Sequence, residues 1–501
     1  MEILLSKQME AADKHAIEVL KIPSIVLMEN AAIAVAEEIA KDLDSSLKIC
    51  VVCGSGNNGG DGYAVARQLV NRGYFVDVVA LNSDNLKGDA KTNYEILLKL
   101  PVRIYQDDFL SLEFLEYDAI IDAIFGTGLN RRVEGEIETL IQKINSSNRR
   151  IYSIDIPSGL SGSSSEILGT NINTFKTITF CRPKLPHVMY PAKSYCGEVI
   201  VKNISIPDSS VAFTKPDNFL LNKETVPRIL PRKPDSHKGS YGHTVIIAGS
   251  IGKIGAGILS AKACINSGSG LTTVVTPKNF INAFHGHLPE AMCFNTVSED
   301  FLTLKDLDAV IDFTADKSCL AIGPGLGTRT ETAKFIENII KKTKNKLVID
   351  ADGINLIKPE WFEYLAFRTV LTPHIGEFCR LIGFTKEDLI KDRLNICKDF
   401  AIRHSVCLVL KSADTIITTP DGKSYIFNEG SAALAKGGSG DVLTGLIASF
   451  ISQGYSVEDA CKIGVYIHGK TGKYIETKYN CMFPKASDLC DNLWVAMNEL
   501  L

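Results

Sequence analysis

The sequence lacks any apolar stretch long enough to span a membrane, and no apolar core follows its first residues. We therefore expect neither a membrane anchor nor a signal peptide. An excess of one charge is also absent, because 54 basic residues face 58 acidic ones and the net charge is −4. This balance favours neither a nucleic-acid nor a membrane partner, although single phosphate sites remain compatible with it. Short repeats and low-complexity tracts are absent as well.

The sequence also lacks a regular cysteine framework. Its 13 cysteines are odd in number and scattered, and most lie in apolar segments, which is typical of reduced thiols in the cytoplasm. Cys50 and Cys53 form a CxxC, a spacing found in metal and redox sites. They fall within a strand-like apolar run, however, and residues three apart on a strand face opposite sides. We predict that both are buried core residues of a cytoplasmic protein.

The first half alternates strand-like and helical segments. Helical periodicity covers 9–41, a further helix is expected at 60–72, and strands are expected at 48–54, 74–81, 118–125 and 150–156. Continuous apolar strands between helices indicate a parallel sheet that is covered on both faces. Ligands bind such sheets at the carboxyl ends of the strands, where the polar motifs of this half also fall.

A proline-containing segment at 207–242 separates this half from the next, and we predict domains at 1–220 and 221–501. Helices are expected in the second half at 439–453 and 457–478. The expected strands are 243–249, 271–277, 309–313, 318–323, 346–350, 369–373 and 405–411, followed by the hairpin 415–419 with 424–428.

Two glycine-rich loops that end in aspartate lie near opposite ends of the chain. The first is Gly54-Ser-Gly-Asn-Asn-Gly-Gly-Asp61-Gly62, and the second is Gly437-Gly-Ser-Gly440-Asp441. Glycine lets the backbone approach a phosphate, and free N–H groups at a helix start attract anions. An aspartate beside such groups repels an anion unless it binds a cation or moves a proton. The two loops therefore predict two active sites.

The first loop matches the dinucleotide-binding pattern at Gly54, Gly56 and Gly59, which alone is weak evidence. The acid that usually binds the ribose should end the second strand, but that strand ends at Asn82. The pattern therefore disfavours a nicotinamide-dependent dehydrogenase. Asparagine and backbone carbonyl groups in the loop are instead hard oxygen donors, suited to an alkali or alkaline-earth cation.

Further polar residues follow strands of the same half. Asp122 ends one strand, and a second glycine nest with two arginines follows at 126–132. Asp155 and Ser158 lie in a proline-fixed turn directly after another strand. An aspartate at a strand end is often only a cap or turn residue, but several at one sheet edge favour a binding site.

With these segments in order and suitably spaced, residues 1–215 resemble the NAD(P)HX epimerase domain, which interconverts the two epimers of hydrated NADH and NADPH. The matching segments are 57–62, Asp122 with 126–129, and 155–159. The resemblance implies that Asn58, Asp122 and Ser158 hold a potassium ion. It implies hydrate contacts from Asn57, Asn58, Gly59, Gly60, Asp61, Gly126, Thr127, Gly128, Leu129, Asn130, Arg131, Arg132 and Asp155.

The chemistry of this reaction narrows the catalytic candidates. Inverting a carbon that bears a hydroxyl next to a nitrogen needs proton transfers. Asp155 is our first candidate for that role. Lys184 is a weaker candidate, because a surface lysine is the more common interpretation of such a residue.

The second loop begins an apolar helix, whose glycine N–H groups would hold a transferring phosphate. Asp441 could take a proton from an attacking hydroxyl. The alternative is a plain N-cap aspartate, but the run Gly437–Gly440 is more flexible than a cap requires. Other candidate residues follow predicted strands at 323–327, 350–353, 374–377 and 411–415.

Residues 225–501 resemble the ribokinase-like fold and, within it, the ADP/ATP-dependent NAD(P)HX dehydratases. The matching segments are 238–243, Gly249-Ser250 with Gly255-Ala256, 372–377 and 435–443. In this family a nucleotide phosphorylates the hydroxyl of the hydrate, and phosphate then leaves to restore the double bond. The resemblance implies Asp441 as the catalytic residue, hydrate contacts from Ala256, Gly325, His374 and Asp441, and nucleotide contacts from Lys411, Ser412, Ala413, Asp414, Thr415 and Gly440.

One position departs from the family pattern, because the family commonly has Lys-Gly at the end of the nucleotide strand and this chain has Lys411-Ser412. The serine side chain could crowd the nucleotide or be harmless. Resemblance to bacterial two-domain members favours ADP over ATP, and magnesium is expected with the transferring phosphate.

Together these features predict an α/β protein with an N-terminal Rossmann-like three-layer domain followed by a ribokinase-like α/β domain. We expect a bifunctional enzyme, and a homo-oligomer, that epimerises NADHX and NADPHX and dehydrates the S epimer while ADP becomes AMP and phosphate. One alternative is a kinase of a small alcohol or vitamin precursor. Another is a first domain that only binds and has lost catalysis, against which its several polar motifs speak.

Overall fold

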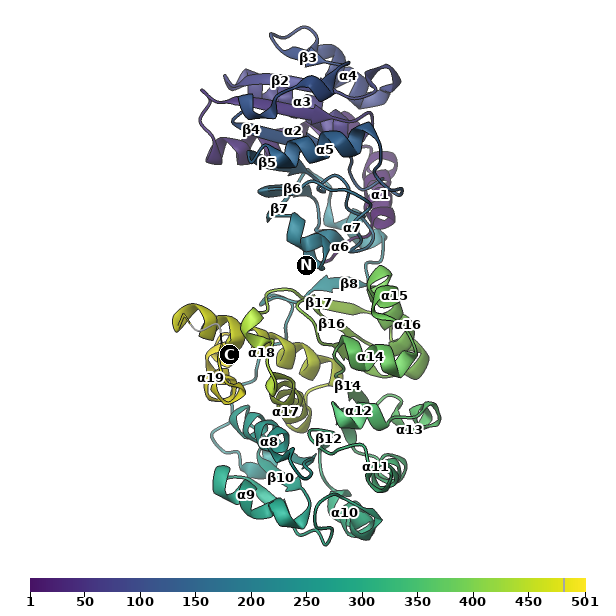
Figure 1. Cartoon of the computed structure of the whole chain (residues 1–501), viewed down its shortest axis with the longest axis vertical. Helices are drawn as coiled ribbons and strands as arrows, with labels where there is room; N and C mark the ends of the chain where they lie inside the picture. Colours follow the sequence, from purple (N-terminus) through teal and green to yellow (C-terminus); the bar gives the residue numbers. More distant parts are fainter. Residues whose placement is uncertain (481–482) are drawn as a thin grey trace. The chain divides into compact units, whose positions relative to one another are not determined.

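A computed structural model describes residues 1–480 and 483–501. Their contacts divide them into an N-terminal unit of residues 2–218 and a C-terminal unit of Met1 with residues 219–501. Figure 1 shows the first in purple to teal and the second in teal to yellow. Within the described residues, no helix combines the length and the apolar character that crossing a membrane requires.

The N-terminal unit contains a seven-stranded sheet in which every neighbouring pair is parallel. Its order is β3-β2-β1-β4-β5-β6-β7, so the chain reverses direction along the sheet between β1 and β4. A crevice opens at the carboxyl ends of strands at such a switch point. The strands are β1 Lys48–Cys53, β2 Phe75–Ala80, β3 Arg103–Tyr105, β4 Ala119–Ala123, β5 Arg150–Ile154, β6 Lys176–Phe180 and β7 Glu198–Lys202.

Helices cover both faces of this sheet, which confirms the predicted three layers. Cys53 packs in a buried cluster with residues of α2 and α3, whereas Cys50 packs in a second cluster with residues of α5. The two cysteines therefore face opposite sides of β1 as buried free thiols, as predicted. The helices are α1 Ser6–Lys14, α2 Ser24–Asp42, α3 Asn57–Asn71, α4 Gly88–Leu97, α5 Glu136–Ser146, α6 Leu185–Val188 and α7 Asp208–Phe213.

The periodic segment 9–41 is not one helix. It comprises the end of α1, a π-helical turn at His15–Val19, and α2, which begins after Pro23. Proline is tolerated at the start of a helix but not in its interior, which explains the break.

The C-terminal unit contains a ten-stranded sheet in the order β11-β10-β9-β12-β13-β14-β15-β16-β17-β8. Strands β11 to β15 are parallel along this order, and β15-β16 and β16-β17 pair antiparallel. The strands are β8 Asn218–Leu220, β9 His243–Ile247, β10 Leu271–Val275, β11 Met292–Phe294, β12 Cys319–Ile322, β13 Lys346–Ile349, β14 Thr369–Leu371, β15 Cys407–Leu410, β16 Thr415–Thr418 and β17 Ser424–Phe427.

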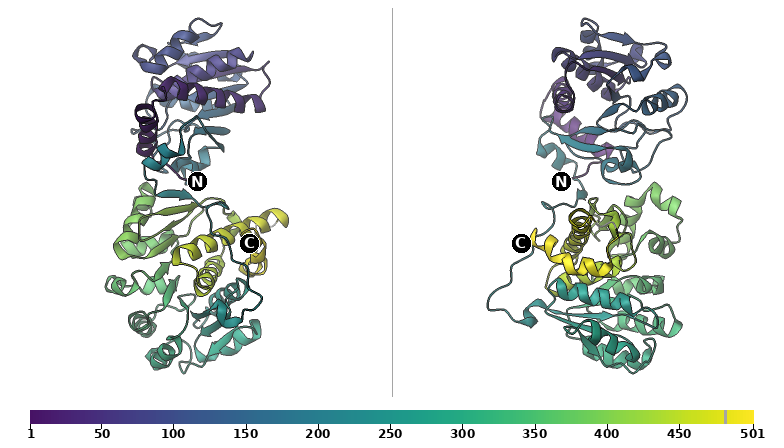
Figure 2. Two further views of the ribbon diagram at one scale, coloured as in Figure 1. Left: turned by 180° about the vertical axis from the view of Figure 1, so that it is seen from behind. Right: turned by 60° about the vertical axis from the view of Figure 1, so that its left-hand side comes forward.

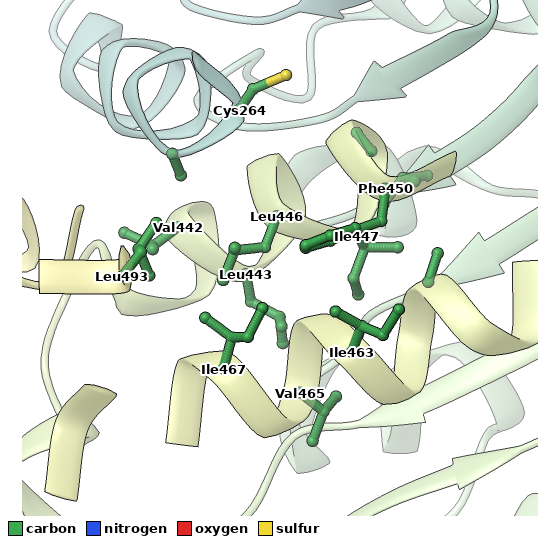
Figure 3. Close-up of a cluster of buried hydrophobic side chains, with 14 of the residues drawn as sticks. Cys264, Val442, Leu443, Leu446, Ile447, Phe450, Ile463, Val465, Ile467 and Leu493 are labelled. Atoms are coloured by element: carbon green, nitrogen blue, oxygen red, sulfur yellow. The ribbon is translucent and has the colours of Figure 1, made fainter. Parts of the chain in front are cut away.

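Helices lie on both sides of this sheet as well (Figures 1 and 2). On one side, α17 packs between α8 and α18, and its side chains Val442, Leu446 and Ile447 fill the buried cluster seen in Figure 3. The helices of the unit are α8 Ile254–Asn266, α9 Ile281–His287, α10 Leu307–Thr314, α11 Thr330–Lys342, α12 Asp352–Leu356, α13 Phe362–Leu365, α14 Ile375–Ile382, α15 Lys386–Lys391, α16 Arg393–His404, α17 Ser439–Ser452, α18 Val457–Lys478 and α19 Ala486–Asn498.

One predicted strand is wrong, because residues 309–313 belong to the helix α10. Its buried residues Leu307, Val310 and Thr314 are spaced three and four apart, which is the period of a helix face. The apolar run inside 309–313 was too short to separate strand from helix by periodicity.

The close packing of α3 on β1 explains why the first loop is rich in glycine, and two substitutions test this explanation. A Cβ at Gly59 would lie 1.8 Å from the Gly54 carbonyl oxygen, whereas a Cβ at Gly56 would meet nothing within 4 Å. Gly59→Ala should therefore destabilise the N-terminal unit by at least about 2 kcal/mol. Gly56→Ala, at an extended backbone, should stay within about 0.5 kcal/mol of the parent. Denaturant unfolding checks both, and equal stabilities would contradict this account.

Candidate active sites

The first glycine loop is the start of a helix rather than a free loop. α3 begins at Asn57, three residues earlier than predicted, and Gly56 is its N-cap. Gly59 packs on Gly54, and a Cβ at Gly62 would lie 2.7 Å from the Cys53 sulfur, so these glycines let the helix approach the strand. The first N–H groups of α3 have no partner within the helix and remain available to an anion.

Asp122 is the centre of a buried hydrogen-bond network at the end of β4. It is 0% exposed and accepts hydrogen bonds from the Ser158 hydroxyl at 2.5 Å, the Ser158 N–H at 2.8 Å and the Ser153 hydroxyl at 2.9 Å. The Ser158 hydroxyl oxygen accepts a bond from the Phe125 N–H at 2.8 Å. Burial raises the pKa of Asp122, although the bonds from Ser158 and Ser153 oppose this.

The residues predicted to hold potassium lie close to one another. A Cβ at Gly126, one residue after Phe125, would lie 3.1 Å from the Asn58 Cβ, so Asn58 adjoins the Asp122–Ser158 network. The side-chain nitrogen of Asn58 is buried without a hydrogen-bond partner. An amide that lacks a partner can turn its oxygen inward, and carboxylate, hydroxyl and amide oxygens are hard donors. This donor set fits an alkali cation.

The second nest of the N-terminal unit presents charge to solvent. Gly128 has open space beside it, and Arg131 and Arg132 are exposed. The Thr127 carbonyl accepts a hydrogen bond of 3.0 Å from the Ser6 hydroxyl, so the N-terminal segment helps to fix this loop. Two unpaired guanidinium groups beside a glycine nest suit a phosphate-bearing ligand.

Asp155 follows β5 with a left-handed backbone, at φ 64°. Its carboxylate accepts hydrogen bonds from the Lys184 ammonium at 2.6 Å and the Thr179 hydroxyl at 2.9 Å. Lys184 also donates to the Thr179 hydroxyl at 2.8 Å and the Phe180 carbonyl at 2.9 Å, so its three protons are all used. Burial works to raise the pKa of Asp155, but Lys184 outweighs it and lowers that pKa.

The prediction that Lys184 is a surface residue is wrong. Its side chain is 1% exposed and directly contacts the predicted catalytic acid. Lys184 follows β6, the neighbour of β5 in the sheet, and this pairing brings the two residues together. Sequence spacing alone did not show that β6 exists, which is why the contact was missed.

Two further carboxylates interact electrostatically with the Lys184–Asp155 pair. Burial raises the pKa of Asp61 well above its usual value, and the charges of Asp155 and Asp13 raise it further. Burial also raises the pKa of Asp13, on α1, to about 6 against the opposing charge of Lys184. Asp13 precedes every motif and gave no signal in the sequence. The buried His187, whose Nε2 has no hydrogen-bond partner among the described residues, also lies outside these motifs and gives no signal in the sequence.

The ionic role of the Lys184–Asp155 pair can be tested by measuring the free energy of unfolding. Lys184→Met leaves a buried carboxylate without its cation, which should cost about 3 kcal/mol at pH 7. In the parent, the lowered pKa of Asp155 means that its contribution is complete above the unfolded value and is lost only as pH falls below it. In the variant the carboxyl can become neutral at low pH. The stability difference should therefore narrow from pH 7 to pH 4 in denaturant titrations; a pH-independent difference would contradict an ionic role.

In the C-terminal unit, Gly325, His374 and Lys411 follow the carboxyl ends of the parallel strands β12, β14 and β15. Gly325, after β12, has φ 64°, and a Cβ there would lie 2.2 Å from the Lys253 carbonyl oxygen. Lys253 is the N-cap of α8, which carries Ala256. The Ser250 hydroxyl, after β9, donates to the Gly325 carbonyl at 2.7 Å. Close backbone approach thus brings Gly325 beside the start of α8.

His374 and Lys411 are neighbours, because a parallel bridge joins them and the Lys411 N–H donates to the Pro373 carbonyl at 2.8 Å. His374 caps α14, since its Nδ1 accepts from the Gly376 N–H at 3.0 Å. Its side chain is 55% exposed, and its Nε2 lies 3.6 Å from the Glu377 carboxylate. A histidine whose Nδ1 accepts carries its proton on Nε2 when neutral, and can donate it to a ligand.

The second glycine loop is the N-terminus of α17. Gly438 is its N-cap, with φ 93°, and Gly440 and Asp441 stand in the first turn. A Cβ at Gly440 would lie 3.0 Å from the Lys411 ammonium nitrogen. Burial and then the Asp350 carboxylate raise the pKa of Asp441 to about 7, which Lys411 partly opposes. Asp441 is therefore divided between its two protonation states near neutral pH, as a proton-transfer group should be.

The serine that departs from the family pattern points into its own loop. The Ser412 hydroxyl donates to the Asp414 carboxylate at 2.9 Å and to the Asp414 carbonyl at 3.0 Å. Asp414 is itself 1% exposed and paired with the buried Arg393. The Asp414 side chain is thus held within the loop. The backbone there, the partly exposed Lys411, Ser412 and Thr415, and the exposed Ala413 remain accessible to a ligand.

Among the described residues, no three His, Cys, Asp or Glu side chains lie together as a metal site would require. The carboxylates after β13 already have partners, since Asp352 accepts from the Gly327 N–H at 2.8 Å and from Lys253 at 3.1 Å. Magnesium commonly retains waters and binds through substrate phosphates with few protein ligands. The residues present suit a magnesium ion that arrives with a nucleotide.

Comparison with known proteins covers both units. A family model described as NAD(P)H-hydrate dehydratase matches residues 244–493, and one described as YjeF-related protein N-terminus matches residues 24–185. A bifunctional NAD(P)H-hydrate repair enzyme of Moorella thermoacetica is 35% identical over 515 residues, which covers 100% of this chain and 97% of the relative. The chain belongs to the family of bifunctional NAD(P)H-hydrate repair enzymes.

Other members of the NAD(P)H-hydrate repair family agree over nearly the whole chain. The enzyme of Thermofilum pendens is 34% identical over 486 residues, covering 94% of this chain and 91% of that one. Among solved structures, a ribokinase-like superfamily protein of Enterococcus faecalis is 26% identical, with a TM-score of 0.50, covering 57% of this chain and 96% of that one. The predicted ribokinase-like fold is therefore confirmed.

Proposed function

We propose that this chain repairs hydrated NADH and NADPH at two separate sites. The N-terminal unit interconverts the R and S hydrates, and the C-terminal unit dehydrates the S form while ADP becomes AMP and phosphate. The strongest support is that each unit joins an anion-binding helix start to a carboxyl whose pKa is raised, Asp61 in one and Asp441 in the other. Relatives with this two-domain length are named for the same repair.

In the epimerase site, the hydrate would lie over the carboxyl ends of β1, β4 and β5. The contacts we propose are Asn57 to Asp61, Gly126 to Arg132, and Asp155. A potassium ion held by Asn58, Asp122 and Ser158 would supply a fixed positive charge there. Arg131 and Arg132, both exposed, would bind the phosphates.

The substrate carbon carries a hydroxyl and a nitrogen, and such a carbon inverts when its ring opens and closes again. Ionised Asp155 would accept the hydroxyl proton as the carbon–oxygen double bond forms and the carbon–nitrogen bond breaks. Neutral Asp61 would give a proton to the nitrogen. Rotation followed by the reverse transfers closes the ring on the other face, with no net change in protons. The opposite pKa shifts of the two acids support this division.

This mechanism predicts an incomplete repair when either acid is changed. With a mixture of both NADHX epimers, ADP, magnesium and potassium, the parent should restore NADH absorbance fully. Asp155→Ala and Asp61→Asn should slow epimerisation at least about 100-fold, so that recovery halts when the S form is consumed. Asp84→Asn, at an exposed carboxylate of the same unit, is the matched control.

The outcomes of this assay separate the alternatives. No return of NADH absorbance would refute the repair function as a whole. A stable phosphorylated alcohol in a substrate screen would instead indicate a kinase. Unchanged epimerisation by Asp155→Ala would place the catalyst elsewhere or leave the N-terminal unit as a binding module.

In the dehydratase site, we propose that Asp441 takes the proton of the hydrate hydroxyl as that oxygen attacks the terminal phosphorus of ADP. The bond from that phosphorus to the bridging oxygen breaks and releases AMP. Phosphate then leaves the ring carbon, which is easier than loss of water, and the neighbouring ring carbon gives up a proton to solvent as the double bond forms. Ala256, Gly325 and His374 would contact the hydrate with Asp441. Lys411 to Thr415 and Gly440 would contact the nucleotide. A magnesium ion bound with the nucleotide would neutralise charge on the phosphates.

The raised pKa of Asp441 sets a pH dependence for dehydration. Only the ionised form can accept the proton, and the pKa is raised to about 7. The kcat/KM for S-NADHX should therefore increase from pH 6 to pH 8 and then level off. Asp441→Asn should reduce kcat by about 100-fold or more at every pH. A pH-independent rate in the parent would contradict the assignment of Asp441 as the base.

A cytoplasmic setting is part of this proposal. Each cysteine in the described residues is a free thiol, as is usual in a reducing compartment. NAD(P)H hydrates also form where these cofactors are used.

A further inference from the structure

Asp350, which follows β13, connects two parts of the dehydratase site. Its Oδ1 accepts a hydrogen bond from the Lys411 ammonium at 2.6 Å, and its Oδ2 accepts one from the Thr444 hydroxyl at 2.8 Å. Lys411 directly follows β15, and Thr444 is on α17, three residues after Asp441. One carboxylate therefore joins the proposed nucleotide-binding lysine to the helix that carries the proposed base.

This carboxylate is buried at a considerable desolvation cost. Asp350 is 1% exposed and Thr444 is 0% exposed. A buried ion pair is weak evidence for stability, because apolar residues of similar volume often stabilise a fold equally well. The next residue, Ala351, has φ 47°, a left-handed backbone that a residue other than glycine rarely adopts. Strain beside a buried charge is typical of functional sites.

We propose that Asp350 is a positioning residue of the dehydratase site, which orients Lys411 toward the nucleotide and places the first turn of α17 for Asp441. This role rests on the proposed dehydratase function. Asp350 does not touch the reacting atoms in this proposal. It acts through the two side chains that it holds.

The charge of Asp350 also affects the pKa of Asp441, and this effect distinguishes positioning from a purely structural role. After burial, the charge of Asp350 is the largest influence that raises the pKa of Asp441. Asp352 and Glu377 also raise that pKa, and Lys411 lowers it. Replacing Asp350 by a neutral residue removes the negative charge that most disfavours ionisation of Asp441. The positive charge of Lys411 is then no longer balanced by Asp350. The pKa of Asp441 should then fall.

The decisive variant is Asp350→Asn, which keeps the shape and an acceptor for Thr444 but removes the charge. The acid limb of kcat/KM against pH should move to lower pH, while the KM for ADP rises roughly 10-fold because Lys411 loses its charged partner. The affinity for ADP, measured by calorimetry, should fall by a similar factor. This measurement tests the proposal even if turnover is too slow for a pH profile. Epimerisation by the same preparation should remain at the parent rate.

Two further variants separate positioning from folding. Thr444→Val removes the hydroxyl at constant shape and should lower kcat roughly 10-fold, whereas Thr444→Ser should restore most of it. Asp316→Asn changes an exposed aspartate that precedes β12, at the amino edge of the sheet, and should leave all parameters unchanged.

An Asp350→Asn enzyme with the parent's pH profile and ADP affinity would overturn the proposal. So would lost activity in Asp350→Asn with an unmoved acid limb and unchanged ADP binding, since that pattern indicates only a general structural role. Absence of dehydration in the parent itself would refute the proposed function instead.

Discussion

A lysine that follows one parallel strand and holds an aspartate that follows another strand of the same sheet is the interaction that the two proposed sites share. In the N-terminal unit Lys184 pairs with Asp155 across β6 and β5. In the C-terminal unit Lys411 reaches Asp350 from β15, two strands along from β13. Each lysine follows a strand at the sheet edge where the glycine-rich helix starts also lie. A parallel sheet makes such pairs possible because it brings all its carboxyl ends to one side.

These pairs explain how acids of one chemical type can have different roles. Lys184 keeps Asp155 ionised, while Asp61, without a cation of its own, becomes hard to ionise. In the other unit Lys411 is shared, because it pairs with Asp350 and also acts on Asp441. In the proposed reactions, the position of each ammonium group relative to the carboxylates would therefore decide which acid gives a proton and which accepts one.

Much of the fold and of the site could be predicted from local sequence patterns. The long buried strands β1, β9 and β13 have continuous apolar runs, and α18 matches its predicted bounds. The sequence reveals Asp122 and Ser158 because Asp122 lies at the end of a strand and Ser158 lies shortly after one. Lys184 and Asp13 were misjudged or missed, because their roles depend on contacts between distant segments, which periodicity cannot reveal. The strand β6, which carries the missing half of the Asp155 pair, has the mixed sequence Lys-Thr-Ile-Thr-Phe.

The departure at Ser412 shows a similar limit. From the sequence, the serine could crowd a nucleotide or be harmless, and only its bond to Asp414 shows that the hydroxyl turns into the loop. Conversely, Gly59 and Gly62 suggest phosphate binding but are explained by the close packing of α3 on the sheet. A residue type can thus match a family motif for a reason other than the ligand.

The burial of Lys184 has a consequence for the conditions under which the N-terminal unit operates. Salt screens charges that face solvent far more than charges enclosed by protein. Arg131 and Arg132 are exposed and will attract a phosphate less strongly as ionic strength rises, whereas the enclosed Lys184–Asp155 pair will keep its charges. In the proposed epimerase reaction, capture of the substrate and chemistry on it would therefore differ in their sensitivity to salt, and a cell that concentrates ions would weaken the first while sparing the second.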